Sequence, residues 1–111
     1  MAVKERKKEQ KLSIMIEEKN ITILIAQNDG MYSAYCPELD LVTAMDTPQE
    51  AIEDMLEAIK DYADEYWKDY DLYTNSPNRQ YHLPYIKRII ACKTTWDLMK
   101  IIEIRYGTIY V

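Results

Sequence analysis

Residues 32–59 read YSAYCPELDLVTAMDTPQEAIEDMLEAI, and this stretch decides the fold. Its first residues alternate in character as a short strand does, and Pro37 must end that strand because proline has no N–H to donate to a sheet. A second short strand follows the turn. Thr47 then has the features of a helix N-cap, with Pro48 at the first helical position and Glu50 as its capping-box partner. The stretch therefore predicts two strands that lead into a helix.

The neighbouring residues extend this unit into a meander. Isoleucine alternates with other residues over 21–26, and the following turn, 27–30, ends in Asp-Gly, a pair typical of tight hairpins. Residues 31–36 and 41–45 supply the next two strands. Residues 12–17 also alternate, so a further strand is possible at one edge of the sheet. We expect an antiparallel sheet.

The predicted helix has an apolar side and an acidic side. Apolar residues recur every three or four positions, which predicts that this stripe packs across one face of the sheet. Acids occupy the opposite side, and those in the first two turns suit the positive end of the helix dipole. The stripe consists of Ile52, Met55, Leu56, Ile59, Tyr62, Ala63, Tyr66 and Tyr70.

Most of the chain is expected to form one α+β domain: a small antiparallel sheet with a β-β-β-α-β core and an extra N-terminal strand, packed by one long amphipathic helix. A flexible basic arm, 1–11, precedes the domain, which spans 12–111. Within it, residues 21–70 form the core and the turn-rich residues 71–85 form a surface loop. Residues 86–111 predict one or two short helices, then one strand, or two strands separated by a Tyr-Gly turn.

The net charge of −5 conceals a strong division along the chain. Residues 47–70 carry eight acids against two lysines, whereas residues 1–11 and 86–111 are each net positive by three charges. An acidic helix between two basic ends indicates a basic partner or a self-association that matches the signs. A solvated helix face with no partner is the alternative that the charges leave open.

The residue types for catalysis are scarce. Cys36 and Cys92 do not form a CxxC motif, and the lone His82 is more simply structural than catalytic. We therefore expect a binding module that is not an enzyme and needs no cofactor or metal. A degenerate metal-dependent nuclease would need carboxylates that converge at strand ends. The candidates for that arrangement are Asp29, Glu38, Asp40 and Asp46, each of which is also a simple turn or pre-cap residue.

No segment of the sequence is a candidate for membrane insertion. The chain opens with charged residues rather than an apolar run, and no stretch approaches about 18 apolar residues. We therefore expect a cytoplasmic protein without membrane contact. The basic arm could touch phosphates, but the total charge is acidic and no helix-turn-helix or ribbon-helix-helix signature is present. Nucleic acid is expected to bind only weakly or through a partner.

The segment from Asp29 to Tyr62 resembles the HicB-like antitoxin family. The likeness lies in a strand that ends in Ala-Tyr-Cys-Pro-Glu-Leu, a second strand, then Asp-Thr, two residues, Glu-Ala and an amphipathic helix. It extends over roughly residues 21–66. The matching positions are Gly30, Tyr35, Cys36, Pro37, Glu38, Leu39, Asp46, Thr47, Glu50, Ala51, Leu56, Ala58 and Ile59.

The resemblance implies a fold and a role. The implied fold is a partial ribonuclease-H-like arrangement without the catalytic cluster, and the implied role is to neutralise a small basic mRNA-cleaving toxin of the HicA type. Three departures stand out. Asp40-Leu41 and Met45 replace glycines that are frequent in the family, and the chain begins with a basic arm and an extra predicted strand. Many family members also carry a C-terminal DNA-binding segment, which residues 83–111 do not resemble.

From these observations we expect a HicB-like antitoxin that binds a HicA-type toxin and forms a homodimer or higher homo-oligomer through tyrosines and isoleucines on an edge strand. An orphan oligomerisation module of the same fold and the degenerate nuclease remain as alternatives. The expected partner-binding residues are Glu38, Asp40, Glu50, Glu53, Asp54, Glu57 and Asp61.

Overall fold

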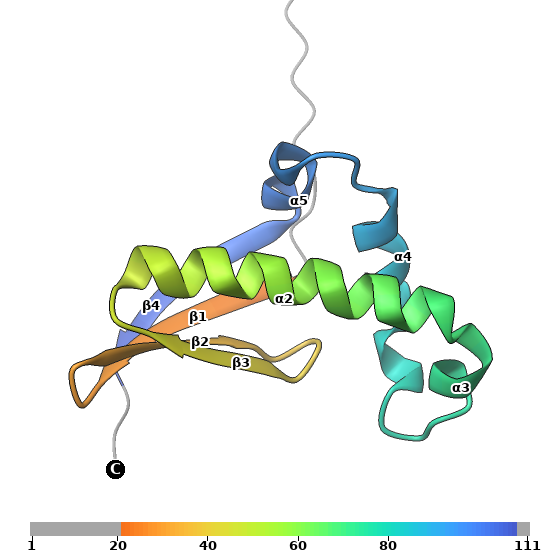
Figure 1. Cartoon of the computed structure of the whole chain (residues 1–111), viewed down its shortest axis with the longest axis horizontal. Helices are drawn as coiled ribbons and strands as arrows, with labels where there is room; N and C mark the ends of the chain where they lie inside the picture. The colour runs from red at the N-terminus through yellow and green to blue at the C-terminus, as the bar shows by residue number, and fades with distance from the viewer. Residues whose placement is uncertain (1–20, 109–111) are drawn as a thin grey trace, which may run out of the picture.

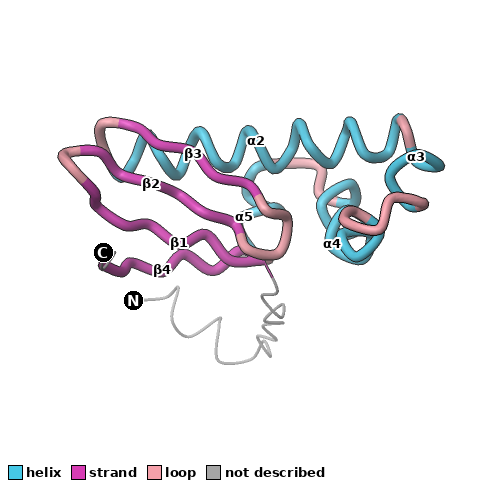
Figure 2. Tube along the Cα trace, turned by 90° about the horizontal axis from the view of Figure 1, so that it is seen from below, coloured by secondary structure: helices cyan, strands magenta, loops and turns pink. Residues whose placement is uncertain are grey.

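The structure is a computed structural model, and it describes residues 21–108. The predicted basic arm, 1–11, and the predicted strand, 12–17, lie outside the described residues, as do the last three residues of the chain. Within the described range the protein is an α+β fold, as predicted: one four-stranded sheet and a set of helices that gather on one of its faces (Figures 1 and 2).

The sheet contains β1 (Ile21–Asn28), β2 (Met31–Cys36), β3 (Leu41–Met45) and β4 (Ile102–Thr108), in the order β3-β2-β1-β4. The first three strands form the predicted antiparallel meander. The last strand is parallel to β1, so the sheet is mixed rather than wholly antiparallel. A parallel neighbour requires a long crossover, which the helices between β3 and β4 provide.

The turns of the meander have the backbone that the sequence predicts. Asp29 and Gly30 join β1 to β2 with φ angles of 51° and 78°, both in the left-handed region that Asp-Gly hairpin turns use. Asp40, which stands where a glycine is frequent in HicB-like proteins, also has a positive φ, 56°. Aspartate tolerates this conformation better than most residues, so the turn forms without glycine.

The helices are α2 (Pro48–Lys68), α3 (Tyr70–Thr74), the short 3-10 helix η1 (Gln80–His82), α4 (Leu83–Ala91) and α5 (Thr95–Lys100). The predicted loop over residues 71–85 is therefore wrong in the main, because most of that segment is helical. The last two helices agree with the predicted C-terminal segment, and β4 runs through the Tyr-Gly pair as one strand within the described range.

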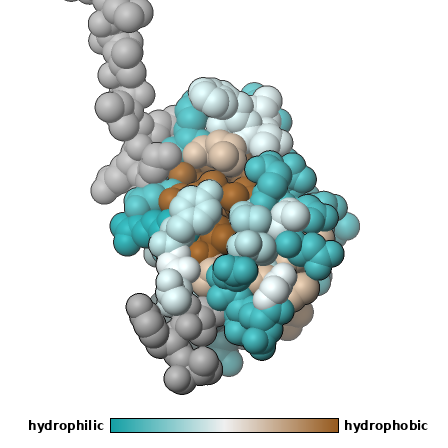
Figure 3. All heavy atoms as spheres, turned by 90° about the vertical axis from the view of Figure 1, so that its left-hand side faces the viewer, coloured by the Kyte–Doolittle hydropathy of each residue, from teal (hydrophilic) through white to brown (hydrophobic). Residues whose placement is uncertain are grey.

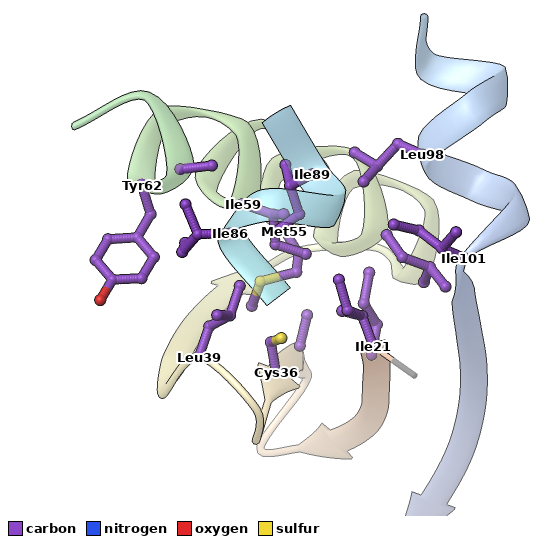
Figure 4. Close-up of a cluster of buried hydrophobic side chains, with 14 of the residues drawn as sticks. Ile21, Cys36, Leu39, Met55, Ile59, Tyr62, Ile86, Ile89, Leu98 and Ile101 are labelled. Carbon is purple, nitrogen blue, oxygen red and sulfur yellow. The ribbon is translucent and has the colours of Figure 1, made fainter. Parts of the chain in front are cut away.

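The core lies between α2 and one face of the sheet (Figure 4). Ile21, Ile23 and Ile25 of β1 point to this face, as the alternation predicts, and are at most 2% exposed. The helix stripe differs from the prediction at its margins: Ile52 and Leu56 are only half-buried, and Tyr70 is exposed in the next helix. The buried residues of α2 are Ala51, Met55, Ile59, Tyr62, Ala63 and Tyr66.

The two faces of the sheet have different surroundings. All described helices lie on the side of α2, and no described helix covers the opposite face, which Figure 2 shows in front of the helices. From the end of the molecule that carries the β1–β2 turn, apolar side chains are visible in a hollow among polar ones (Figure 3). The second half of α2 projects beyond the sheet and packs against α3, η1 and α4 (Figure 1).

Candidate functional site

Carboxylates line one side of α2, and we call the five of them that were predicted to bind a partner the acidic face: Glu50, Glu53, Asp54, Glu57 and Asp61. Neighbours along this row are at most four residues apart, so at 3.6 residues per turn all five lie on one side of the helix. This side is opposite the buried stripe and therefore points away from the sheet. Asp54 is half-buried and the other four are exposed.

The start of α2 orients the first of these acids. The Thr47 hydroxyl accepts a hydrogen bond from the Glu50 N–H at 3.1 Å and donates one to the Glu50 carboxylate at 2.9 Å. One turn later, the Gln49 amide donates to Glu53 at 3.0 Å. Among residues 21–108, the ion pairs involve Asp97 and Glu103, so no acid of the acidic face is neutralised by a described cation.

Glu38 does not belong to this surface, although it was predicted with it. Its carboxylate accepts a hydrogen bond from the Thr22 N–H at 2.8 Å, and the Cys36 thiol lies 3.8 Å from the same oxygen. The β1–β2 register continued by two residues places Thr22 opposite Pro37. The Glu38 side chain therefore completes the end of the hairpin, and its carboxylate is turned toward the sheet.

Asp40 also lies apart from the acidic face. It occupies the β2–β3 turn and is close enough to act electrostatically on Tyr62, a member of the buried stripe of α2, and on His82. That position is on the sheet side of the helix. The structure thus brings together five of the seven predicted partner-binding residues and separates the two that precede α2.

Three tyrosines pack with an arginine and a histidine beyond the sheet, a group that was not predicted as a unit. We call it the tyrosine cluster: Tyr62, Tyr66, Tyr73, Arg79 and His82. The rings of Tyr66 and Tyr73 are stacked at 5.0 Å, and the Tyr66 hydroxyl donates to the carbonyl of Arg79 at 3.0 Å. The Arg79 guanidinium lies 5.3 Å from the ring centre of Tyr62 and 5.7 Å from that of Tyr73. These contacts fasten residues 70–82 to the second half of α2.

His82 has a structural place in this cluster, in agreement with the prediction. It is 6% exposed, and its Nδ1 lies 2.7 Å from the Tyr62 hydroxyl. Burial lowers the pKa of the imidazole, so the ring is neutral at pH 7, and the bond between Nδ1 and the Tyr62 hydroxyl joins two uncharged groups. The helical spacing of Tyr62 and Tyr66 was the one sequence signal for the cluster; Tyr73 and Arg79 join it only through the tertiary fold.

Acidification is expected to destabilise the protein through His82. Burial is the main cause of its lowered pKa, Asp40 acts in the opposite direction and Arg79 in the same direction. A histidine with a lowered pKa in the folded state binds more protons when unfolded. Its stabilising contribution is therefore complete above about pH 6.5 and is lost as the pH falls toward the folded-state pKa, by at most about 1.4 kcal/mol per pH unit.

Urea unfolding between about pH 7.5 and pH 5.5 checks this prediction, with His82→Gln as the control. Glutamine retains an oxygen that can accept from Tyr62, and the variant has the same carboxylates as the wild type. The unfolding free energy of the wild type should fall more steeply with decreasing pH. Equal slopes for the two proteins would mean that folding does not lower the pKa of His82.

Two further kinds of chemistry-bearing residue, the thiols and the strand-end carboxylates, can be located among residues 21–108. Burial raises the pKa of the Cys36 thiol to about 12, so it stays protonated at neutral pH and is a poor nucleophile. No three His, Cys, Asp or Glu side chains of residues 21–108 gather as metal ligands. The strand-end carboxylates that a nuclease would need therefore do not converge. None of the described helices is long and apolar enough to cross a membrane.

The described residues thus form a small α+β unit that holds a row of carboxylates outward on a firmly packed helix. The chain belongs to the family PHD_like, described as antitoxin of toxin-antitoxin, RelE / RelB, TA system; the family model matches residues 2–104. The prediction of an antitoxin is thus confirmed at the level of the family. A comparison with curated proteins gives no match.

One solved structure is similar over most of this chain. It is the crystal structure of an antitoxin part of a candidate toxin/antitoxin system from Syntrophomonas wolfei subsp. wolfei, with a TM-score of 0.70 and 27% sequence identity. The likeness covers 79% of this chain and 64% of that chain. The present chain therefore spans slightly less than two thirds of the length of that structure.

Proposed function

We propose that this protein is an antitoxin that binds a small, basic, mRNA-cleaving toxin and covers its RNA-binding surface with the acidic face. The observation that carries the proposal is the acidic face itself, five carboxylates on the outward side of a helix whose other side is fixed to the sheet. Such a row of carboxylates is an anionic array, as the phosphates of RNA are. It is therefore complementary to a basic surface that binds RNA. The protein acts by binding and performs no catalysis.

The flank of the acidic face has a shape that suits a long basic side chain. A shallow hollow of about 320 Å³ lies between α2 and α5, with half-buried Leu56 inside it and Glu53 and Glu57 among its lining residues. At the same place, the Lys60 ammonium donates a hydrogen bond to the Thr95 hydroxyl at 2.9 Å. An arginine or lysine of the toxin could lay its apolar stem on Leu56 and direct its charged head to the two glutamates.

The resemblance of residues 29–62 to HicB-like antitoxins favours a toxin of the HicA type, whereas the family description names the RelE / RelB pair. The acidic face requires only that the partner be basic. The protein encoded by the adjacent reading frame distinguishes the two types, once it has been purified and its sequence and fold have been determined. A toxin that cleaves mRNA also places the complex in the cytoplasm.

Reversal of two charges, Glu57→Lys together with Asp61→Lys, is expected to weaken toxin binding roughly 10- to 100-fold, because each replaces an attraction to a basic surface by a repulsion. The probe is the basic protein encoded by the adjacent reading frame, and the readout is isothermal titration calorimetry. Wild-type affinity should also fall as salt is raised, since exposed charges are screened beyond about 8 Å at physiological ionic strength.

The matched control is Asp69→Lys together with Asp71→Lys, which changes the net charge by the same amount at the far end of α2. Asp69 makes no capping hydrogen bond with its side chain, and both residues are exposed. This variant should bind the toxin within a few-fold of the wild type. If the two double variants lose affinity equally, only net charge matters and the acidic face is not the contact. Undiminished binding by the first variant excludes the proposed surface.

A further inference from the structure

The sheet face opposite α2 has an ordered surface, which we call the open face. The strand register places one residue from each strand side by side, so residues form rows that cross all four strands. One row carries larger side chains and the adjacent row carries small ones. The first row, the ridge, is Val42, Tyr35, Leu24 and Arg105. The second row, the trough, is Ala44, Ser33, Ala26 and Gly107.

The apolar side chains of the ridge are exposed together rather than singly. The exposed fractions are 69% for Val42, 41% for Tyr35 and 37% for Leu24. A shallow hollow of about 560 Å³ lies on this face and is lined by residues of both rows. Large apolar side chains scattered over a surface need no explanation, but a contiguous group of them marks an interaction site.

The charges of the open face argue against a basic partner. Arg105 is the one charged side chain in the two rows, and its guanidinium is paired with Glu103 on the same strand. The acidic face, in contrast, lies on the other side of α2 and attracts cations. A basic toxin is therefore drawn to the acidic face, and the open face suits an apolar, uncharged surface. A second copy of this chain presents such a surface.

We propose that two copies of the protein associate through their open faces, with the ridge of one copy in the trough of the other. Rows on one face of a strand are two residues, or about 6.8 Å, apart, and packed sheets are separated by about 10 Å, a distance that interdigitated side chains fill. A two-fold axis between the sheets makes each ridge meet the partner's trough, so the contact is self-complementary. The acidic faces of both copies remain outward.

The size of the open face sets the strength of the association. Four strands and six residues make a face of roughly 20 by 20 Å, so two such faces bury an area near the lower limit of about 1,000 Å² for specific interfaces. We therefore expect a reversible dimer with a dissociation constant in the micromolar range. The sequence predicted a homodimer through an edge strand. The open face instead uses Val42 of edge strand β3 together with inner-strand residues such as Tyr35.

Sedimentation velocity of the full chain, at total concentrations from about 1 μM to 500 μM, tests the proposal. The wild type should change from monomer to dimer across this range. The variant Val42→Lys should dimerise at least 10-fold more weakly, because it brings a charge into an apolar contact, and lysine is well tolerated on an edge strand. The variant Tyr35→Thr, which keeps a strand-forming residue, should weaken the dimer in the same direction.

The matched control is Leu72→Lys, the same kind of substitution at a residue of α3 that is 68% exposed and lies off the sheet. It should dimerise like the wild type. A wild type that stays monomeric up to the highest concentration overturns the proposal, and so does a Val42→Lys variant that dimerises normally. Calorimetry with the basic protein gives an independent outcome: if Val42→Lys abolishes that binding, the open face belongs to the toxin and not to a second copy.

Discussion

Replacement of Tyr66 by alanine is expected to lower the free energy of unfolding by about 3–5 kcal/mol, as is usual for removal of a buried aromatic ring. Tyr66 is fully buried, stacks on Tyr73 and donates a hydrogen bond to the backbone of Arg79. The substitution thus leaves a cavity, breaks an aromatic pair and removes one of the two hydrogen bonds that the Arg79 carbonyl accepts, the other coming from the His82 N–H. Because domains of this size are stable by only about 5–15 kcal/mol, a large fraction of the protein should unfold on mild heating.

The control for this prediction is Tyr66→Phe, which keeps the ring and removes only the hydroxyl. It should lower the free energy of unfolding by about 1 kcal/mol, the usual contribution of one hydrogen bond. Urea unfolding followed by far-UV circular dichroism measures both variants. If the alanine variant is as stable as the phenylalanine variant, the tyrosine cluster does not hold residues 70–82 against α2.

The second large effect is expected at the centre of the sheet, where two neighbouring residues of β1 face opposite sides. Ile23→Ala should lower the free energy of unfolding by about 2–5 kcal/mol, because the side chain is fully buried beneath α2. Leu24→Ala should lower it by less than about 1 kcal/mol, since Leu24 is 37% exposed on the open face.

Both substitutions remove aliphatic carbons from the same strand, so their difference isolates the side of the sheet that forms the core. The measurement is urea unfolding at low protein concentration, below the range where dimers are expected. Equal losses of stability would mean that both faces of the sheet are covered in the monomer. A larger loss at Leu24 than at Ile23 would contradict the register of β1.

Much of the fold could be predicted because its signals are local. Pro37 cannot donate to a sheet, Asp29-Gly30 accepts a positive φ, and Thr47 caps a helix through its own hydroxyl. Each of these effects depends on residues within a few positions. The side of α2 that carries the acidic face could be predicted for the same reason, since helical spacing alone separates it from the buried stripe.

The candidate site was only partly predictable, because a carboxylate in a turn has no periodicity to show where it points. Glu38 was expected at the surface for a partner, but its carboxylate turns inward to accept a hydrogen bond from the Thr22 N–H, which lies opposite Pro37. Residues 71–85 contain turn formers, yet they become helical where Tyr73 and His82 pack against the tyrosines of α2. Tertiary contact overrode local propensity in both places.

The sequence by itself determined the meander, the cap and polarity of α2, and the row of acids, because turns, caps and periodicity depend on neighbours along the chain. Only the tertiary structure decided that β4 joins β1 in parallel and that Arg105 completes the row of Leu24 and Tyr35. Those pairings join residues far apart in sequence. Their free energy depends on which edge of the meander is still free to pair when β4 reaches the sheet. The open face, and with it the proposed dimer, follows from that pairing.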